Sequence, residues 1–160
     1  SQSVRVDGIE LQASTGTAGA ILSYGNPSPF NSVSVTSGEY IIGYAPIHIP
    51  PGVTMGTLEA RTFLNVSTST SIPAGTTGYG VGVSIYRVGG ESTVAPAIAT
   101  LNASASGWQT VSAAVGQVVS SSQSYVVGGT LTASSCAGNN WVQLAWVQIS
   151  YTRPDYAKVY

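Results

Sequence analysis

Residues 141–154 read WVQLAWVQISYTRP, and their apolar residues are unevenly spread over the two faces of a predicted strand. Successive side chains of an extended strand point to opposite faces. One face is then apolar for most of its length, from Trp141 to Tyr151. The other face is apolar only as far as Trp146 and becomes polar from Gln148 onward. Strict alternation therefore predicts that something covers the second face over its first half.

The same two-residue repetition of apolar residues recurs along the chain, with turn signals such as Pro50-Pro51-Gly52 between the repeats. Abundant Gly, Ser, Thr and Val, with few Glu, Lys or Leu, argue against helices. The clearest predicted strands span residues 3–12, 39–49, 57–67, 79–88, 94–101, 108–119, 124–133 and 140–152. This pattern predicts an all-β fold, an antiparallel two-sheet sandwich of jelly-roll type, with an up-and-down barrel as the alternative.

The length of 160 residues indicates a single β-sandwich domain over residues 1–160, long enough to bury roughly 70% of its unfolded surface. Residues 13–38, rich in small residues and proline, are expected to form a long loop or an edge segment. Residues 154–160 are expected to form a C-terminal tail. The single cysteine, Cys136, excludes an intrachain disulfide and a zinc site built from cysteines.

Charge is unusually scarce: charged residues make up 7% of the chain, against about 25% in ordinary soluble proteins. No Asp, Glu, Lys or Arg occurs between Glu91 and Arg153. The five scattered cations make no phosphate-tracking stripe, so we expect no nucleic-acid partner. No run of 18 apolar residues occurs either, so we expect no membrane insertion. A surface with so little charge is suited to self-association.

Catalytic chemistry has weak support in this sequence. His48, the only histidine, lies between two isoleucines, and nothing in its spacing places a serine, a cysteine or a carboxylate beside it. A second histidine to share a metal is missing. Two flanking carboxylates would suffice for a glycosidase, but Glu59 and Arg61 are better interpreted as a surface ion pair. We therefore expect neither an enzyme nor a cofactor.

The segment YGVGVSIYRV has one nearly bare face, formed by Gly80, Gly82, Ser84 and Tyr86. A bare strand face lets another backbone or a flat ring approach closely. A tight contact between the two sheets is the favoured interpretation, and a ligand platform is the alternative.

Aromatic and amide side chains near turns are the best binding candidates, because rings stack on sugars and amides bond to hydroxyls without any charge. Trp108 and Trp141 each follow a predicted turn, where binding residues tend to lie. Asn139 and Asn140 lie in the second of these turns, and Tyr86 borders the bare face. For the tryptophans a place in the core is the more common alternative.

The chain ends with a hairpin, SYVVGGTLTA followed by WVQISYTRP, and contains the segments IPPGVT and IPAGTTGYGVGVSIYRV. Over roughly residues 46–153 this pattern resembles the C-terminal jelly-roll domains of bacteriophage tail fibres and tail spikes. The resemblance implies a homotrimeric, non-enzymatic head on the virion surface. Such a head would have a cell-surface saccharide as its partner and bind host-surface glycans, or it would lock the trimer together.

A trimer would also explain the half-covered face of residues 141–154. Val142, Leu144 and Trp146 would then lie against a neighbouring copy. In the tail, Tyr156 and Tyr160 could dock on an adjacent subunit, and a frayed end is the alternative.

Three non-catalytic hypotheses follow. The first is the trimeric adhesion head of a phage fibre or spike. The second is a capsid decoration or coat protein, which would self-associate without binding glycans. The third is a free-standing lectin or carbohydrate-binding module, secreted and monomeric.

Overall fold

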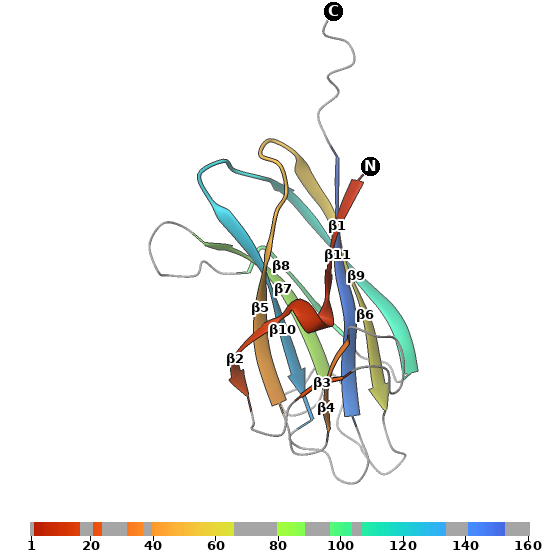
Figure 1. Ribbon diagram of the computed structural model, residues 1–160. Coiled ribbons are helices and arrows are strands. Elements are labelled where there is room, and N and C mark those ends of the chain that lie inside the picture. Colours follow the sequence, from red (N-terminus) through yellow and green to blue (C-terminus); the bar gives the residue numbers. More distant parts are fainter. Residues whose placement is uncertain are drawn as a thin grey trace, which may run out of the picture.

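The computed structural model describes residues 2–16, 21–23, 32–36, 40–65, 80–88, 97–103, 107–133 and 141–152. Within these ranges the chain forms two β-sheets packed face to face, joined early by one short 3-10 helix (Figure 1). No helix in these ranges is long and apolar enough to cross a membrane.

Sheet A contains six strands in the described ranges, and β11 is its central element. On one side β11 pairs with β6, which pairs in turn with β9. On its other side β11 pairs first with β4 and then with β1, while β3 lies outside β4. The strands are β1 (Gln2–Asp7), β3 (Ile21–Ser23), β4 (Ser32–Thr36), β6 (Thr54–Asn65), β9 (Gly107–Val118) and β11 (Trp141–Thr152).

Sheet B contains five strands in the described ranges, in the order β2-β5-β10-β7-β8. They are β2 (Gln12–Gly16), β5 (Tyr40–Ile47), β7 (Gly80–Val88), β8 (Ala99–Asn102) and β10 (Ser124–Thr132). Every strand pair is antiparallel, and the chain crosses repeatedly between the sheets, as between β5 and β6 and between β9 and β10. The predicted antiparallel two-sheet sandwich of jelly-roll type is confirmed.

The core fills the space between the inner faces of the two sheets. Met55, Leu58 and Leu64 of β6 face Ile85 of β7 and Leu131 of β10, and all five side chains are fully buried. In sheet B, inward and outward residues alternate as predicted. This alternation fixes which side chains reach the outer face of the sheet.

A β-bulge in β11 explains the uneven pattern of residues 141–154. Leu144 pairs with Thr62 and Trp146 with the preceding residue of β6, Arg61, so Ala145 is an extra residue. Before the bulge Leu144 points inward, and after it Val147 points inward. The strict alternation assumed from the sequence is therefore wrong at Ala145, and β11 presents one continuous apolar stripe to the core.

The predicted contact of Val142 and Leu144 with a second copy is corrected by their burial. Both side chains are 0% exposed within the single chain. Sheet B supplies the cover for Leu144: a Cβ added at Gly129 of β10 would lie 3.4 Å from Leu144 Cδ2. Trp146, which follows the bulge residue Ala145, is half-buried on the outer face of sheet A. Tyr156 and Tyr160, like the rest of the predicted tail over residues 154–160, lie outside the described residues.

The predicted strand over residues 3–12 is interrupted by the 3-10 helix η1 (Gly8–Glu10). At its start the backbone N–H of Asp7 donates a hydrogen bond to Glu10 Oε2 at 2.6 Å. A Cβ at Gly8 would meet the carbonyl oxygen of Leu144 and lie 2.8 Å from the backbone nitrogen of Val33. Only glycine fits there, so the chain turns tightly over sheet A before it enters sheet B.

The expected loop or edge segment, residues 13–38, includes most of β2 and all of β3 and β4. In the described ranges β2 is one of the two edge strands of sheet B, and β3 lies outside β4 in sheet A.

The bare face of β7 points away from the core, so the favoured interpretation of a tight contact between sheets is wrong. Val81, Val83 and Ile85 point inward and are 0% exposed. Gly82, Ser84 and Tyr86 alternate with them and are half-exposed on the outer side of sheet B.

Candidate functional site

The outer side of sheet B carries a set of aromatic and neutral polar side chains, which we call the tyrosine face. Strand register places Tyr44 of β5, Gly128 of β10, Ser84 of β7 and Thr100 of β8 in one row across the sheet. Tyr86 and Asn102 lie in the neighbouring rows. The tyrosine face is therefore defined as Tyr44, Ser84, Tyr86, Thr100, Asn102 and Gly128.

Gly128 lets two tyrosine rings meet close to the surface of the sheet. A Cβ at this position would lie 2.7 Å from Tyr86 Cε2 and 3.0 Å from Tyr44 Cε1. The two rings make an edge contact, with centroids 6.1 Å apart and planes at 62°. Tyr44 is 37% exposed, so part of its ring is available to a ligand. The glycine thus positions a pair of rings in which each supports the other.

Neutral hydrogen-bonding groups flank the ring pair. Ser84 Oγ and Thr100 Oγ1 lie 2.9 Å apart and share a hydrogen bond. In the next row the Asn102 amide lies over Gly82, where a Cβ would be 3.1 Å from Asn102 Oδ1. Hydroxyls and amides both donate and accept, so this edge of the face matches a ligand that does the same.

Charge is kept off the tyrosine face. In the described part of sheet B the outward positions of β5, β7, β8 and β10 contain no Asp, Glu, Lys or Arg. Arg87 of β7 alternates onto the core side, with its Nε buried. A charged ligand would therefore find no counter-charge on the tyrosine face.

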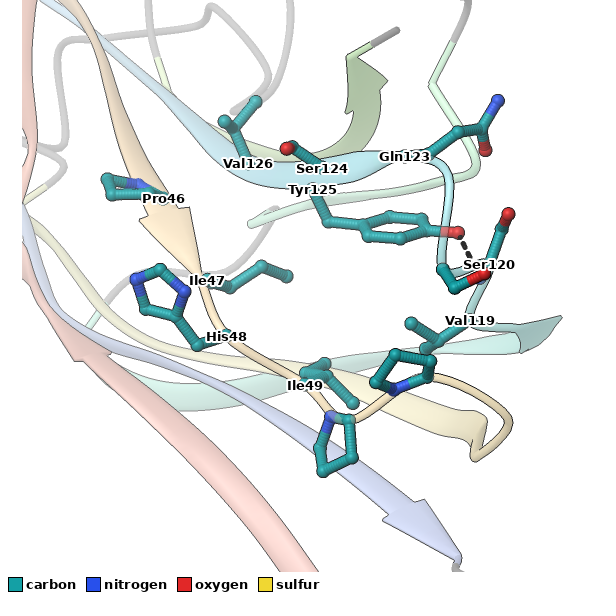
Figure 2. A pocket seen from close by; sticks show the side chains of 13 residues that line it. Pro46, Ile47, His48, Ile49, Val119, Ser120, Gln123, Ser124, Tyr125 and Val126 are labelled. Atoms are coloured by element: carbon teal, nitrogen blue, oxygen red, sulfur yellow. Dashed lines mark hydrogen bonds between the residues drawn. The ribbon is translucent and has the colours of Figure 1, made fainter.

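A hollow that we call the end groove lies where β5 and β10 separate beyond the Ile47–Tyr125 pair (Figure 2). The turn after β5 and the turn before β10 form its walls. The walls are joined again by hydrogen bonds from Gly52 N to Val119 O and from Val119 N to Val53 O, both 2.9 Å. The groove has a volume of about 450 Å³ and is lined by Pro46, Ile47, His48, Ile49, Pro50, Pro51, Val119, Ser120, Ser121, Gln123, Ser124, Tyr125 and Val126.

The Tyr125 ring lies across the end groove, and its hydroxyl accepts a hydrogen bond from the backbone N–H of Ser120 at 2.9 Å (Figure 2). Isoleucine and proline side chains form the apolar part of the lining. Ser121, Gln123 and Ser124 supply neutral polar groups. Their side chains make no hydrogen bond to another described residue.

The outer face of sheet A is different, because arginines lie over the rings of Trp108 and Trp146. Trp108 packs against Phe63, with ring centroids 5.1 Å apart, and the Arg61 guanidinium lies 5.5 Å from its ring. Arg5 lies 4.2 Å from the Trp146 ring and donates two hydrogen bonds to Gln148 Oε1, at 2.8 and 3.1 Å. These cation–π contacts occupy ring surface that a ligand would need.

Of the predicted ligand-binding residues, the two whose side chains the structure describes do not come together in one site. Tyr86 lies on the tyrosine face, whereas Trp108 lies on the outer face of the other sheet. Asn139 and Asn140 lie outside the described residues, as does the side chain of Trp141. Sequence reasoning missed Tyr44, although the alternation in YIIGYAPI places it opposite the buried Ile41 and Ala45.

Metal ligands do not gather among the residues that the structure describes. Among them, no group of three His, Cys, Asp or Glu side chains is close enough to hold a metal ion. His48 lines the end groove, where none of the lining residues is a carboxylate or a cysteine.

No protein-family model matches this chain, and no curated protein matches it by sequence. Solved structures are similar in fold over nearly the whole chain. The CBM36-1 domain of a multidomain xylanase from the hindgut metagenome of Trinervitermes trinervoides has a TM-score of 0.56 and 12% identity, over 96% of this chain and 100% of that one.

Two further structures are similar to a comparable degree. The C-terminal CBM6 of LamC, a marine laminarinase from Zobellia galactanivorans, has a TM-score of 0.52 and 15% identity, over 93% of this chain and 99% of that one. TmCBM61, solved with β-1,4-galactotriose, has a TM-score of 0.53 and 9% identity, over 91% of each chain. At these identities the likeness is one of fold: the chain shares the jelly roll of carbohydrate-binding modules. These neighbours are not phage tail-fibre heads.

Proposed function

We propose that this chain is a non-catalytic carbohydrate-binding module that holds a neutral saccharide against the tyrosine face. The observation that carries the proposal is the ring pair of Tyr44 and Tyr86 over Gly128, beside the Ser84–Thr100 hydroxyls. Its support from the comparisons is the fold alone, which the chain shares with carbohydrate-binding modules. The hypothesis of a lectin or carbohydrate-binding module thus fits better than the others.

Binding would combine stacking with neutral hydrogen bonds. The C–H face of a sugar ring packs on the exposed part of the Tyr44 ring, and the sugar hydroxyls bond to Ser84, Thr100 and Asn102. Tyr86 holds the Tyr44 ring through their edge contact. Because the face is built on paired strands, little order has to be gained on binding, and the entropic cost stays low.

The test is affinity electrophoresis against neutral polysaccharides, namely xylan, laminarin and β-1,4-galactan, followed by calorimetry on those that retard the protein. Tyr44→Ala should weaken binding about tenfold or more, as expected for an exposed aromatic anchor. Val118→Ala is the matched control, because it removes another exposed apolar side chain, 55% exposed, from β9 of sheet A. Equal binding by the Tyr44 and Val118 variants would contradict the proposal.

A trimeric adhesion head on a virion is the second candidate, and the low charge of the chain favours it. With Val142 and Leu144 covered by their own fold, a trimer would need another surface. The outer face of sheet A, where Trp146 is half-buried under Arg5, is such a surface. Light scattering decides: a mass near 16.3 kDa supports the free, secreted module, and three times that value supports the trimeric head.

A further inference from the structure

The end groove is an open hollow whose two walls meet at either end. Toward sheet B the walls meet at the Ile47–Tyr125 strand pair, whose side chains are buried, and the lining continues to Pro46 and Val126. At the other end it stops at the Gly52–Val119 hydrogen bond. Its volume, about 450 Å³, falls in the range of small-ligand sites. A group the size of one sugar unit can enter such a hollow.

The chemistry of the lining selects a neutral ligand with one apolar side. No Asp, Glu, Lys or Arg lines the groove. The rings of Pro50 and Pro51 offer flat apolar surface. Gln123 and Ser124 offer donors and acceptors that no other described residue uses. A pyranose ring, which has an apolar C–H face and a rim of hydroxyls, has this combination of properties.

The end groove is continuous with the tyrosine face. Pro46 and Val126 line the groove and also pair with each other on the outer side of sheet B. Val126 pairs on its other side with Tyr86. It lies two residues along β10 from Gly128, a rise of about 7 Å in a strand. A saccharide lying along β5 and β10 over the tyrosine rings would therefore run directly to the groove.

We propose that the end groove takes the terminal sugar residue of the saccharide whose following residues lie on the tyrosine face. The module then recognises the ends of neutral glycan chains and not their interiors. This inference rests on the proposed function, since it extends the same binding surface by one subsite. Because the groove stops at Gly52 and Val119, an end of the glycan chain fits into it and an internal stretch does not.

The experiment uses three hexasaccharides: xylohexaose, laminarihexaose and β-1,4-galactohexaose. Each is prepared in three forms. One form is unmodified, one carries a bulky group on its non-reducing terminal residue, and one carries the same group at its reducing end. Calorimetry with the intact chain should show that one of the two blocks weakens binding roughly tenfold, while the other leaves it unchanged. A groove variant, Gln123→Ala with Ser124→Ala, should bind the free hexasaccharide as weakly as the wild type binds the blocked one. In that variant the block should cause no further loss.

The matched control is Ser112→Ala, which removes an exposed hydroxyl from the outer face of sheet A and should leave every affinity unchanged. Wild-type protein that binds both blocked forms as tightly as the free hexasaccharide overturns the inference, and so does a groove variant with wild-type affinity. In either case a loss of binding in Tyr44→Ala would still uphold the proposed function. If none of the three hexasaccharides binds, the proposed function fails and this inference fails with it.

Discussion

Replacing Gly128 with alanine tests whether the arrangement of the tyrosine rings matters for binding. Carbon atoms in contact prefer a separation of about 3.5–4.0 Å. The new Cβ would lie 2.7 Å from Tyr86 Cε2 and 3.0 Å from Tyr44 Cε1. The first ring must therefore move by about 1 Å and the second by about 0.5 Å. Both rings are on the outer face, so they can move without disturbing the core.

The expected effect of Gly128→Ala falls on binding more than on stability. An aromatic pair contributes about 0.5–1.5 kcal/mol. If the sugar loses that much binding free energy when the rings are displaced, Kd rises roughly two- to tenfold. The lost pair also lowers the free energy of unfolding, but alanine offsets this by restricting the unfolded chain. The net change should stay within about 1 kcal/mol, or about 4 °C in Tm.

Calorimetric titration with the polysaccharide that binds the wild type, together with thermal unfolding, measures both quantities. Gly56→Ala is the matched control: it makes the same change on the outer side of β6, where the nearest atom is Ser150 Oγ at 3.2 Å. A Gly128→Ala protein with unchanged Kd and unchanged Tm would refute the reasoning that Gly128 positions a binding platform. If the variant unfolds early, Tyr44→Ala tests the same platform without adding an atom.

Three further predictions concern the core, the chain crossing and the binding face. Leu144→Ala should lower the free energy of unfolding by about 2–5 kcal/mol in urea titrations, because the side chain is fully buried, while Leu144→Met should cost less than about 1.5 kcal/mol. Gly8→Ala should cost about 2–3 kcal/mol, since its Cβ meets backbone atoms of Leu144 and Val33 that cannot rotate away; a loss as small as that of Gly56→Ala would contradict this. Saccharide affinity should be the same in about 0.05 and 0.5 M NaCl, because neither the neutral saccharide nor the tyrosine face carries a charge; a steep salt dependence would contradict the binding of a neutral ligand.

The sandwich was predictable because its signal is local. In β7 the alternation of Val81, Val83 and Ile85 with small or polar residues is sufficient to define a strand with one buried side. The same alternation does not say whether the bare side of such a strand meets the other sheet or solvent. That depends on which strand becomes its neighbour, and here β10 and β8 leave the bare side outside.

Other features depend on contacts between distant parts of the chain. The bulge at Ala145 occurs where β4 ends and β1 begins as the neighbour of β11, and no residue of WVQLAWVQ marks that change. The end groove depends on the hydrogen bonds of Val119 with Gly52 and Val53, which join two separate turns. The sequence offers Tyr86 as a candidate binding residue, because it borders the bare face of β7. Its partner Tyr44 is recognised only once β10 lies between the two strands.

The pairing of the first strand with the last has a consequence for protein engineering. Gln2 is opposite Tyr151, and the Tyr151 hydroxyl donates a hydrogen bond to Gln2 Oε1 at 3.0 Å. The two ends of the described fold thus leave the domain side by side, at the pole that carries the turns around the end groove (Figure 1). Such a domain can be grafted into a surface loop of a carrier protein without separating its ends. The carrier would then stand next to the end groove and leave the tyrosine face open to solvent.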